Sequence, residues 1–189
     1  GVMSHQALSG KPDKETRLLE GRRYIQMCLD LKEAIEAANI PVEIVSSGET
    51  WTYDVACDME GVTEVEGGTY ALMGTNYSYM TEFQSAGKIL STVISTPRPG
   101  VAIGDVGYRA LGSPNGVLPS VEHNTDLFVS VLHEGSIVVV SNNHMPLKTG
   151  DKFCIYSAQS DVMVNRWDQI IGIRDGFVEE VWLSYTHLR

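Results

Sequence analysis

The sequence predicts an α/β segment followed by an all-β segment. Up to about residue 75, short apolar runs that predict strands flank a segment whose apolar residues recur at helical spacing. From about residue 80, short β-rich runs alternate with turn signals. The chain has 189 residues, of which 43% are apolar and 20% charged, so it can bury a core and is too apolar to be disordered. One or two compact domains follow from this length.

Residues 1–4 form neither an initiator nor the basic and apolar opening of a signal peptide. They are instead typical of the end of a buried strand. We therefore expect the chain to be a fragment or a processed product of a longer polypeptide. Asp13 is the expected N-cap of a helix that carries Glu15 in its first turn and stops before Pro41. The apolar stripe of this helix consists of Leu18, Ile25, Cys28, Leu31, Ile35 and Ala38.

A short apolar strand is expected over residues 42–46, with Gly48 opening the loop after it. Strand, helix and strand within about 45 residues form a βαβ unit, which implies parallel strands. A further apolar stretch covers residues 69–73. Two or three parallel strands with one helix leave faces and edges bare. The first segment should therefore complete a larger sheet supplied by another polypeptide or by an N-terminal half.

The second segment predicts a barrel or sandwich, because its β-rich runs are short and closely spaced. The expected strands are residues 89–95, 101–103, 127–132, 136–140, 152–156, 162–164, 170–173 and 177–183.

Charge and cysteine usage exclude several classes of protein. A net charge of -10 repels phosphate backbones, so we expect no nucleic-acid partner. No run of about 18 apolar residues exists, so we expect no membrane span. The three cysteines form no CxxC pair and no zinc pattern, which favours a reduced, cytoplasmic protein.

The best local candidate for chemistry follows the second strand, at residues 46–53. Backbone amides and hydroxyls at the carboxyl end of a parallel strand can hold a phosphate, although an ordinary loop capped by Ser and Thr has the same composition. Glu49 suits a phosphate only if its side chain points away. His5 closes the first strand, where barrel enzymes place active-site side chains. Gln159 and Asp161 are a second, poorer candidate, for which a polar turn is the favoured interpretation.

The order of several motifs resembles the second half of the D-threonine aldolase and D-serine dehydratase-like enzymes. No single motif is decisive, but their order is fairly specific and covers nearly the whole chain. The motifs are residues 1–5, 44–53, 61–70, 92–95, 105–107, 146–152, 164–165 and 174–182.

This resemblance implies an alanine-racemase-like architecture of fold type III. Residues 1–78 would be the last strands and helix of a (β/α)8 barrel that binds pyridoxal 5'-phosphate, incomplete alone, and residues 79–189 a C-terminal β-barrel or sandwich domain. In the family a lysine on the first barrel strand forms the Schiff base, and the loop matching residues 46–53 cradles the cofactor phosphate. The implied site residues are His5 as the catalytic group, Ser46, Gly48, Thr50 and Tyr53 at the cofactor, and Asp161 and Gln159 at a metal.

Three departures from the family pattern stand out. The lysine-bearing strand is absent, since every available lysine falls in a loop, the helix or the β domain. The phosphate loop carries Glu49 and Trp51 where small residues are usual. The metal position reads Gln159 and Asp161, which keeps the acid and loses the imidazole, so a divalent metal ion is doubtful.

The expected function is that of a portion of a pyridoxal-phosphate-dependent lyase. It would act on D-3-hydroxy amino acids as an aldolase or dehydratase, once assembled with the N-terminal half that carries the lysine. The complete unit is expected to form a homodimer and to take a small amino-acid substrate. The alternatives are a non-catalytic binding or regulatory protein on the same scaffold, and an amino-acid racemase.

Overall fold

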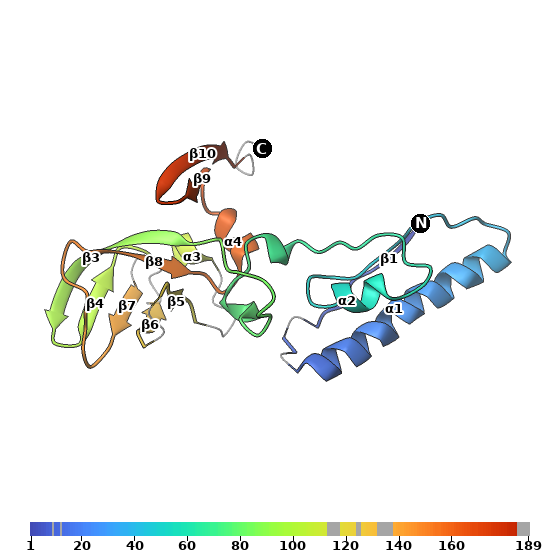
Figure 1. Ribbon diagram of the computed structural model, residues 1–189, viewed down its shortest axis with the longest axis horizontal. Coiled ribbons are helices and arrows are strands. Elements are labelled where there is room, and N and C mark those ends of the chain that lie inside the picture. The colour runs from blue at the N-terminus through green and yellow to red at the C-terminus, as the bar shows by residue number, and fades with distance from the viewer. Residues whose placement is uncertain (9, 12, 113–117, 124–125, 132–137, 185–189) are drawn as a thin grey trace. The chain divides into compact units, whose positions relative to one another are not determined.

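A computed structural model describes residues 1–189 except residues 9, 12, 113–117, 124–125, 132–137 and 185–189 (Figure 1). The chain divides into two compact units. Unit 1 comprises Gly1–Ala71 and Tyr77–Gln84, and unit 2 comprises Leu72–Asn76 and Ser85–Arg189. Within the described part of the chain, no helix has both the length and the apolar character needed to cross a membrane.

Unit 1 contains the expected strand, helix and strand. β1 (Val2–Ser4) pairs in parallel with β2 (Val45–Ser47), and the register places Ser4 opposite Ser47. The intervening helix α1 (Lys14–Ala37) packs along both strands (Figure 1). The parallel pairing is therefore confirmed, although β2 lies slightly later than the predicted residues 42–46.

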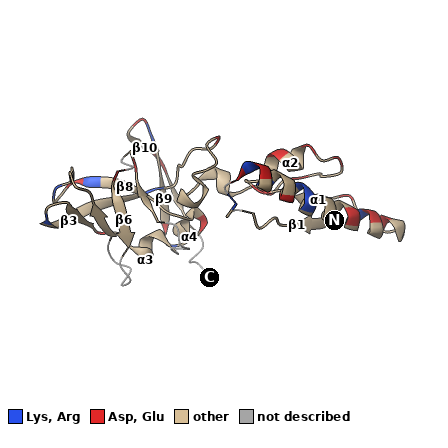
Figure 2. Cartoon of the chain, turned by 90° about the horizontal axis from the view of Figure 1, so that it is seen from below, with Lys and Arg blue, Asp and Glu red and all other residues tan. Residues whose placement is uncertain are grey.

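An N-cap and a left-handed residue set the two ends of α1. The Asp13 carboxylate accepts a hydrogen bond from Thr16 N at 2.7 Å and caps the helix. The helix ends at Ala37, before Pro41, because Asn39 adopts a left-handed conformation with φ of 60°. Acidic and basic residues both lie along the helix, so most of its surface is suited to solvent (Figure 2).

The core of unit 1 joins α1, β2 and the short helix α2 (Tyr53–Cys57). Its buried members are Ile25, Cys28, Leu29, Val42, Val45, Val55, Ala56 and Met59. Leu31, predicted to belong to the buried stripe, is exposed, and Leu29 takes its place. Residues 69–73 add no strand: they contain the 3-10 turn η1 (Thr69–Ala71). Among the residues described in unit 1, the sheet continues only as a parallel bridge between Ser46 and Glu64. A second 3-10 turn, η2 (Thr75–Tyr77), lies where the chain passes between units.

Unit 2 is built on an antiparallel sheet of six strands in the order β5-β8-β3-β4-β7-β6. The edge strands β5 and β6 contact each other, so the sheet nearly closes on itself. The core enclosed by this sheet includes Val93, Ala102, Val138, Val140 and Ile155. The bounds of the strands are Ile89–Arg98 (β3), Val101–Gly104 (β4), Ser120–Val121 (β5), Phe128–Val131 (β6), Val138–Ser141 (β7) and Lys152–Tyr156 (β8).

Two further helices and a hairpin complete unit 2. The helices are α3 (Tyr108–Leu111) and α4 (Ser160–Val164). β9 (Gln169–Arg174) and β10 (Phe177–Leu183) form a separate two-stranded antiparallel sheet.

The strand predicted over residues 162–164 is wrong, because these residues belong to α4. Ser160 and Asp161 start this helix after β8, and its buried Met163 packs into the core of unit 2. Residues 132 and 136–137 of two other predicted strands lie outside the described residues.

Candidate functional site

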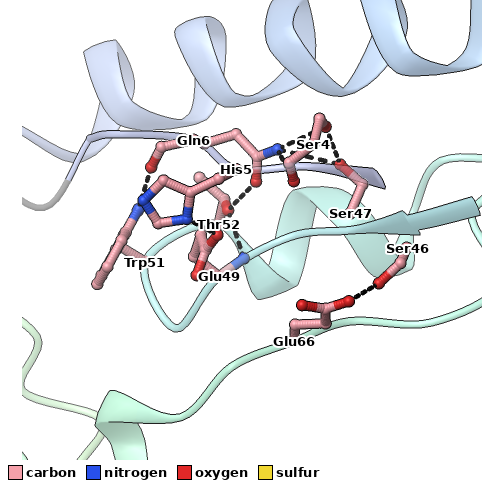
Figure 3. Close-up of polar contacts among 9 residues, drawn as sticks. All are labelled: Ser4, His5, Gln6, Ser46, Ser47, Glu49, Trp51, Thr52 and Glu66. Atoms are coloured by element: carbon pink, nitrogen blue, oxygen red, sulfur yellow. Dashed lines mark hydrogen bonds and ion pairs between the residues drawn. The ribbon is translucent and has the colours of Figure 1, made fainter. Parts of the chain in front are cut away.

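The candidate site lies where β1 and β2 end side by side. Because the strands are parallel, their carboxyl ends meet, and the hydroxyls of Ser4 and Ser47 are 2.7 Å apart (Figure 3). His5 and Gln6 follow the first strand, and Gly48 begins the loop that follows the second. The fold therefore brings together the two segments that sequence analysis selected separately.

Gln6 joins these segments and was missed by sequence analysis. Its side chain has no solvent exposure. Its Nε2 atom donates to the hydroxyls of Ser4 and Ser47, each at 3.0 Å, and its Oε1 atom accepts from the Thr52 hydroxyl at 3.3 Å. Its backbone carbonyl accepts from Trp51 Nε1 at 2.7 Å. A single glutamine gives no sequence pattern, so nothing in the sequence predicted this network.

The loop after β2 has a conformation that requires glycine at its start. Gly48 has a φ of +115°, and a Cβ atom there would lie 2.6 Å from the Cβ atom of Ala56. Next, Glu49 and Thr52 close a tight turn, because Thr52 N donates to Glu49 O and Glu49 N donates to the Thr52 hydroxyl, both at 3.0 Å. The loop is therefore held by its own hydrogen bonds as well as by Gln6.

A second glycine segment packs on this loop. Glu66 N donates to Gly48 O at 3.1 Å, and Tyr70 N donates to the buried Thr50 hydroxyl at 3.1 Å. A Cβ atom on Gly67 would meet Thr50 N at 3.4 Å, so the two segments approach closely. Among the described residues, no acceptor is assigned to the N–H groups of Gly67 and Gly68. Backbone N–H groups without an acceptor are the type of group that can bind an anion.

The predicted cofactor residues occupy different positions in this arrangement. Gly48 and Thr50 form the contact between the loops. The Ser46 hydroxyl donates to the Glu66 carboxylate (Figure 3), so a bound phosphate would have to compete with that carboxylate. Tyr53 lies at the start of α2, where its ring packs edge-on against Phe83 with centroids 5.5 Å apart. Glu66, Gly67 and Gly68 were not selected as site residues, although they lie within the motif at residues 61–70.

His5 and Glu49 face each other across the ends of the two strands (Figure 3). The Nδ1 atom of His5 hydrogen bonds the Glu49 carboxylate. The Glu49 side chain is 13% exposed and that of His5 is 61% exposed. Burial raises the pKa of Glu49, His5 opposes this rise, and the nearby charge of Glu66 adds to it. The ring of Trp51 meets the His5 ring edge-on and stacks on Tyr77 with centroids 5.8 Å apart.

The predicted metal residues lie in unit 2, at the start of α4. Gln159 occupies the N-cap position and Asp161 is exposed in the first turn. Among the described residues, no group of three His, Cys, Asp or Glu side chains is arranged to hold a metal ion. One amide and one exposed carboxylate do not make a metal site on their own.

Comparisons with known proteins identify related sequences and folds. Residues 86–173 match the family model described as "Putative serine dehydratase domain". The 3-hydroxy-D-aspartate aldolase of Paracoccus denitrificans is 28% identical over 193 aligned residues, covering 96% of this chain and 48% of that protein. The D-threo-3-hydroxyaspartate dehydratase of a Delftia species is 33% identical over 121 residues, covering 61% of this chain and 32% of that protein.

A solved structure has the same fold. The D-threonine aldolase from Filomicrobium marinum matches with a TM-score of 0.86 at 20% identity, over 96% of this chain and 51% of that one. The chain spans about half the length of the relatives it matches. These findings confirm the resemblance stated from the sequence.

Proposed function

We propose that this chain, which is similar over nearly its whole length to the C-terminal half of the D-threonine aldolase and D-serine dehydratase-like enzymes, supplies the cofactor-phosphate end of a pyridoxal-phosphate-dependent lyase. Its substrates would be D-3-hydroxy amino acids, cleaved by retro-aldol reaction or dehydrated. The relatives support this class, because their names describe aldolases and a dehydratase acting on hydroxylated D-amino acids.

The contact between the two glycine segments carries this proposal. A Cβ atom on Gly67 would lie 3.4 Å from Thr50 N, so the two segments are in direct contact, and the Gly67 and Gly68 N–H groups have no assigned acceptor in the described chain. A cofactor phosphate would accept from these N–H groups and from the Thr50 hydroxyl, with Gly48 shaping the loop. Ser46 would join them only when its hydroxyl leaves Glu66. The residues present therefore fit the phosphate of pyridoxal phosphate.

His5 is the proposed catalytic group. When bound, pyridoxal phosphate supplies an electron sink for the bond broken at the substrate Cα atom. His5 would accept the proton of the substrate 3-hydroxyl at Nε2, because its Nδ1 atom is already bonded to Glu49. Tyr53 would flank the cofactor from the start of α2. Among the described residues, the donor set at Gln159 and Asp161 does not fit a metal ion.

A second polypeptide segment would complete the site. Within the described chain β1 pairs only with β2, and Met3 on β1 is exposed, which supports the addition of further strands at this edge. That N-terminal half would carry the lysine that binds the cofactor, since neither β1 nor β2 contains a lysine. Residues 1–78 would then end a barrel, residues 79–189 would form the β domain, and the complete unit would be a homodimer.

Cofactor binding by the assembled protein tests the proposal. The chain is co-expressed with the lysine-bearing N-terminal half of a relative, and the purified complex is examined for the visible absorbance of protein-bound pyridoxal phosphate. Thr50→Glu places a negative charge against the phosphate, so we expect it to weaken cofactor retention at least tenfold. Thr96→Glu, at an exposed position in unit 2, is the matched control and should retain the cofactor.

Thr50→Val separates loss of binding from loss of folding, because it removes the hydroxyl while keeping the shape of the side chain. We expect weaker cofactor retention from a complex that still forms. A complex that forms without cofactor absorbance in the unaltered protein would refute the enzyme proposal.

The substitutions in the phosphate loop favour one alternative, a non-catalytic binding or regulatory protein. Glu49 and Trp51 put large side chains in this loop where the family usually has small ones. The Ser46 hydroxyl already donates a hydrogen bond to Glu66. This alternative predicts that the complex forms without cofactor and that Thr50→Glu changes nothing. An amino-acid racemase shares the cofactor, and product analysis with each enantiomer of a 3-hydroxy amino acid would separate racemisation from cleavage.

A further inference from the structure

We propose that Glu49 is a positioning residue that holds the His5 imidazole with its proton on Nδ1 and its lone pair on Nε2. The inference rests on the proposed function for its catalytic meaning, but its structural part concerns this chain alone. It also accounts for the acidic residue in a loop proposed to bind a phosphate.

The chemistry of the two groups sets the direction of the hydrogen bond when Glu49 is ionised and His5 is neutral. His5 Nδ1 lies within hydrogen-bonding distance of Glu49 Oε1 (Figure 3). An ionised carboxylate can only accept, so the neutral imidazole must donate from Nδ1. The Glu49 side chain is mostly buried while His5 is mostly exposed, so the bond holds an exposed ring against a buried partner. The remaining nitrogen, Nε2, is then unprotonated and free to accept a proton.

Hydrogen bonds and ring contacts of neighbouring residues hold both members of the pair in place. The backbone of Glu49 makes two hydrogen bonds with Thr52, both at 3.0 Å: Glu49 N donates to the Thr52 hydroxyl, and Glu49 O accepts from Thr52 N. His5 precedes Gln6, whose buried side chain ties the ends of β1 and β2 together. The His5 ring also meets the edge of Trp51, with centroids 6.2 Å apart and an interplanar angle of 84°. A group held by rigid neighbours in this way meets the requirement for a preorganised base.

The surroundings of Glu49 are unfavourable for a carboxylate, which argues that it has a function. Burial raises the pKa of Glu49, and the like charge of Glu66 raises it further, against the opposing effect of His5. The backbone N–H of Gln6 also donates to this carboxylate and, like His5, lowers its pKa, but burial remains the largest effect. A glycine would avoid this desolvation cost altogether. Keeping a carboxylate here is consistent with a role in directing His5.

The consequence for the reaction is a base of defined tautomer. Nε2 would take the proton of the substrate 3-hydroxyl, and the O–H electron pair would form the carbonyl of a released aldehyde. The bond between Cα and Cβ would break, and pyridoxal phosphate, when bound, would supply the electron sink for its electron pair. Without Glu49, the neutral imidazole can place its proton on Nε2, and it could then no longer accept this proton.

Nitrogen NMR of histidine-labelled protein tests the tautomer without any cofactor. The 15N shifts of the unaltered chain should show His5 protonated at Nδ1, with the signal assigned by its loss in His5→Asn. Glu49→Met removes the acceptor at similar size and should abolish this preference. Glu49→Gln keeps an acceptor oxygen and should largely retain it. Glu64→Met, at an exposed acidic position, is the control and should leave the His5 signals unchanged.

Activity of the assembled complex gives the second readout. Glu49→Met should lower kcat/KM by about 100-fold or more, in the range of general base catalysis, and Glu49→Gln by less. His5 shifts that do not respond to Glu49→Met would overturn the positioning role even if the complex is active. An inactive, cofactor-free complex with the predicted shifts would instead refute only the proposed function.

Discussion

Glu122, directly after the edge strand β5 of unit 2, accepts hydrogen bonds from two side chains. Lys88 Nζ donates to its carboxylate, and the Tyr156 hydroxyl donates to it at 3.0 Å. Burial acts to raise the pKa of Glu122, but the bonds from Lys88 and Tyr156 outweigh burial and hold it below its usual range. Burial, the bond to Glu122 and the charge of Glu122 raise the pKa of Tyr156 to about 12. The cluster is thus built around an ionised carboxylate and a neutral phenol.

This cluster predicts a specific loss of stability at alkaline pH. Between pH 10 and 12 the unfolded chain releases the Tyr156 proton while the folded chain keeps it, so stability falls as the pH rises. The contribution is fully present below pH 10. Because Tyr156 is partly exposed, we expect an effect of about 1 kcal/mol. Urea unfolding at pH 9, 10 and 11 should show a shallower decline for Tyr156→Phe than for the unaltered chain, and equal declines would contradict the assignment.

At the scale of elements, Gln6 determines how β1, β2 and the loop after β2 fit together. Its side chain bonds Ser4, Ser47 and Thr52, which belong to three different segments. Because these groups are buried or nearly so, removing their shared partner leaves several of them without a hydrogen bond.

Gln6→Leu should therefore lower the free energy of unfolding by about 2–3 kcal/mol. Gln26→Leu is the matched control, because Gln26 is exposed on α1 and bonds only Asp30 at 2.8 Å among the described residues. We expect the control to change stability by less than about 0.5 kcal/mol. Chemical denaturation of both variants measures the difference, and a Gln6 variant as stable as the control would show that the network is dispensable.

Local sequence patterns predicted the elements with strong periodicity. The runs at residues 152–156 and 177–183 coincide with β8 and β10, and the parallel pairing of β1 with β2 followed from their connection through a helix. The run at residues 162–164 failed because three β-favouring residues do not decide a segment whose first turn and buried Met163 favour a helix.

The candidate site was predicted only where a residue type carried its own signal. Gly48 and His5 could be selected because a glycine loop and a strand-end histidine are recognisable alone. Gln6 and the bond from Ser46 to Glu66 depend on residues about 20 to 40 positions apart, and no local pattern contains such pairs.

For the whole molecule, the exposed apolar surface supports assembly with further polypeptide. The hairpin of β9 and β10 exposes apolar side chains along both strands, including Ile173, Phe177 and Trp182. In unit 1, Met3 on β1 and Leu19 and Met27 on α1 are also exposed. Large exposed apolar side chains on one hairpin or one helix, as in each unit here, are common at interfaces. The proposed N-terminal half and dimer partner would bury part of it.

The central claim is that the loops after β2 and around Gly67 bind the phosphate of pyridoxal phosphate in the assembled protein. Titration of the co-expressed complex with pyridoxal phosphate and with pyridoxal, followed by absorbance, tests it most directly. Two or more charge-assisted hydrogen bonds to the phosphate should make pyridoxal phosphate bind at least about 100-fold more tightly. Equal affinities for the two compounds would contradict the account.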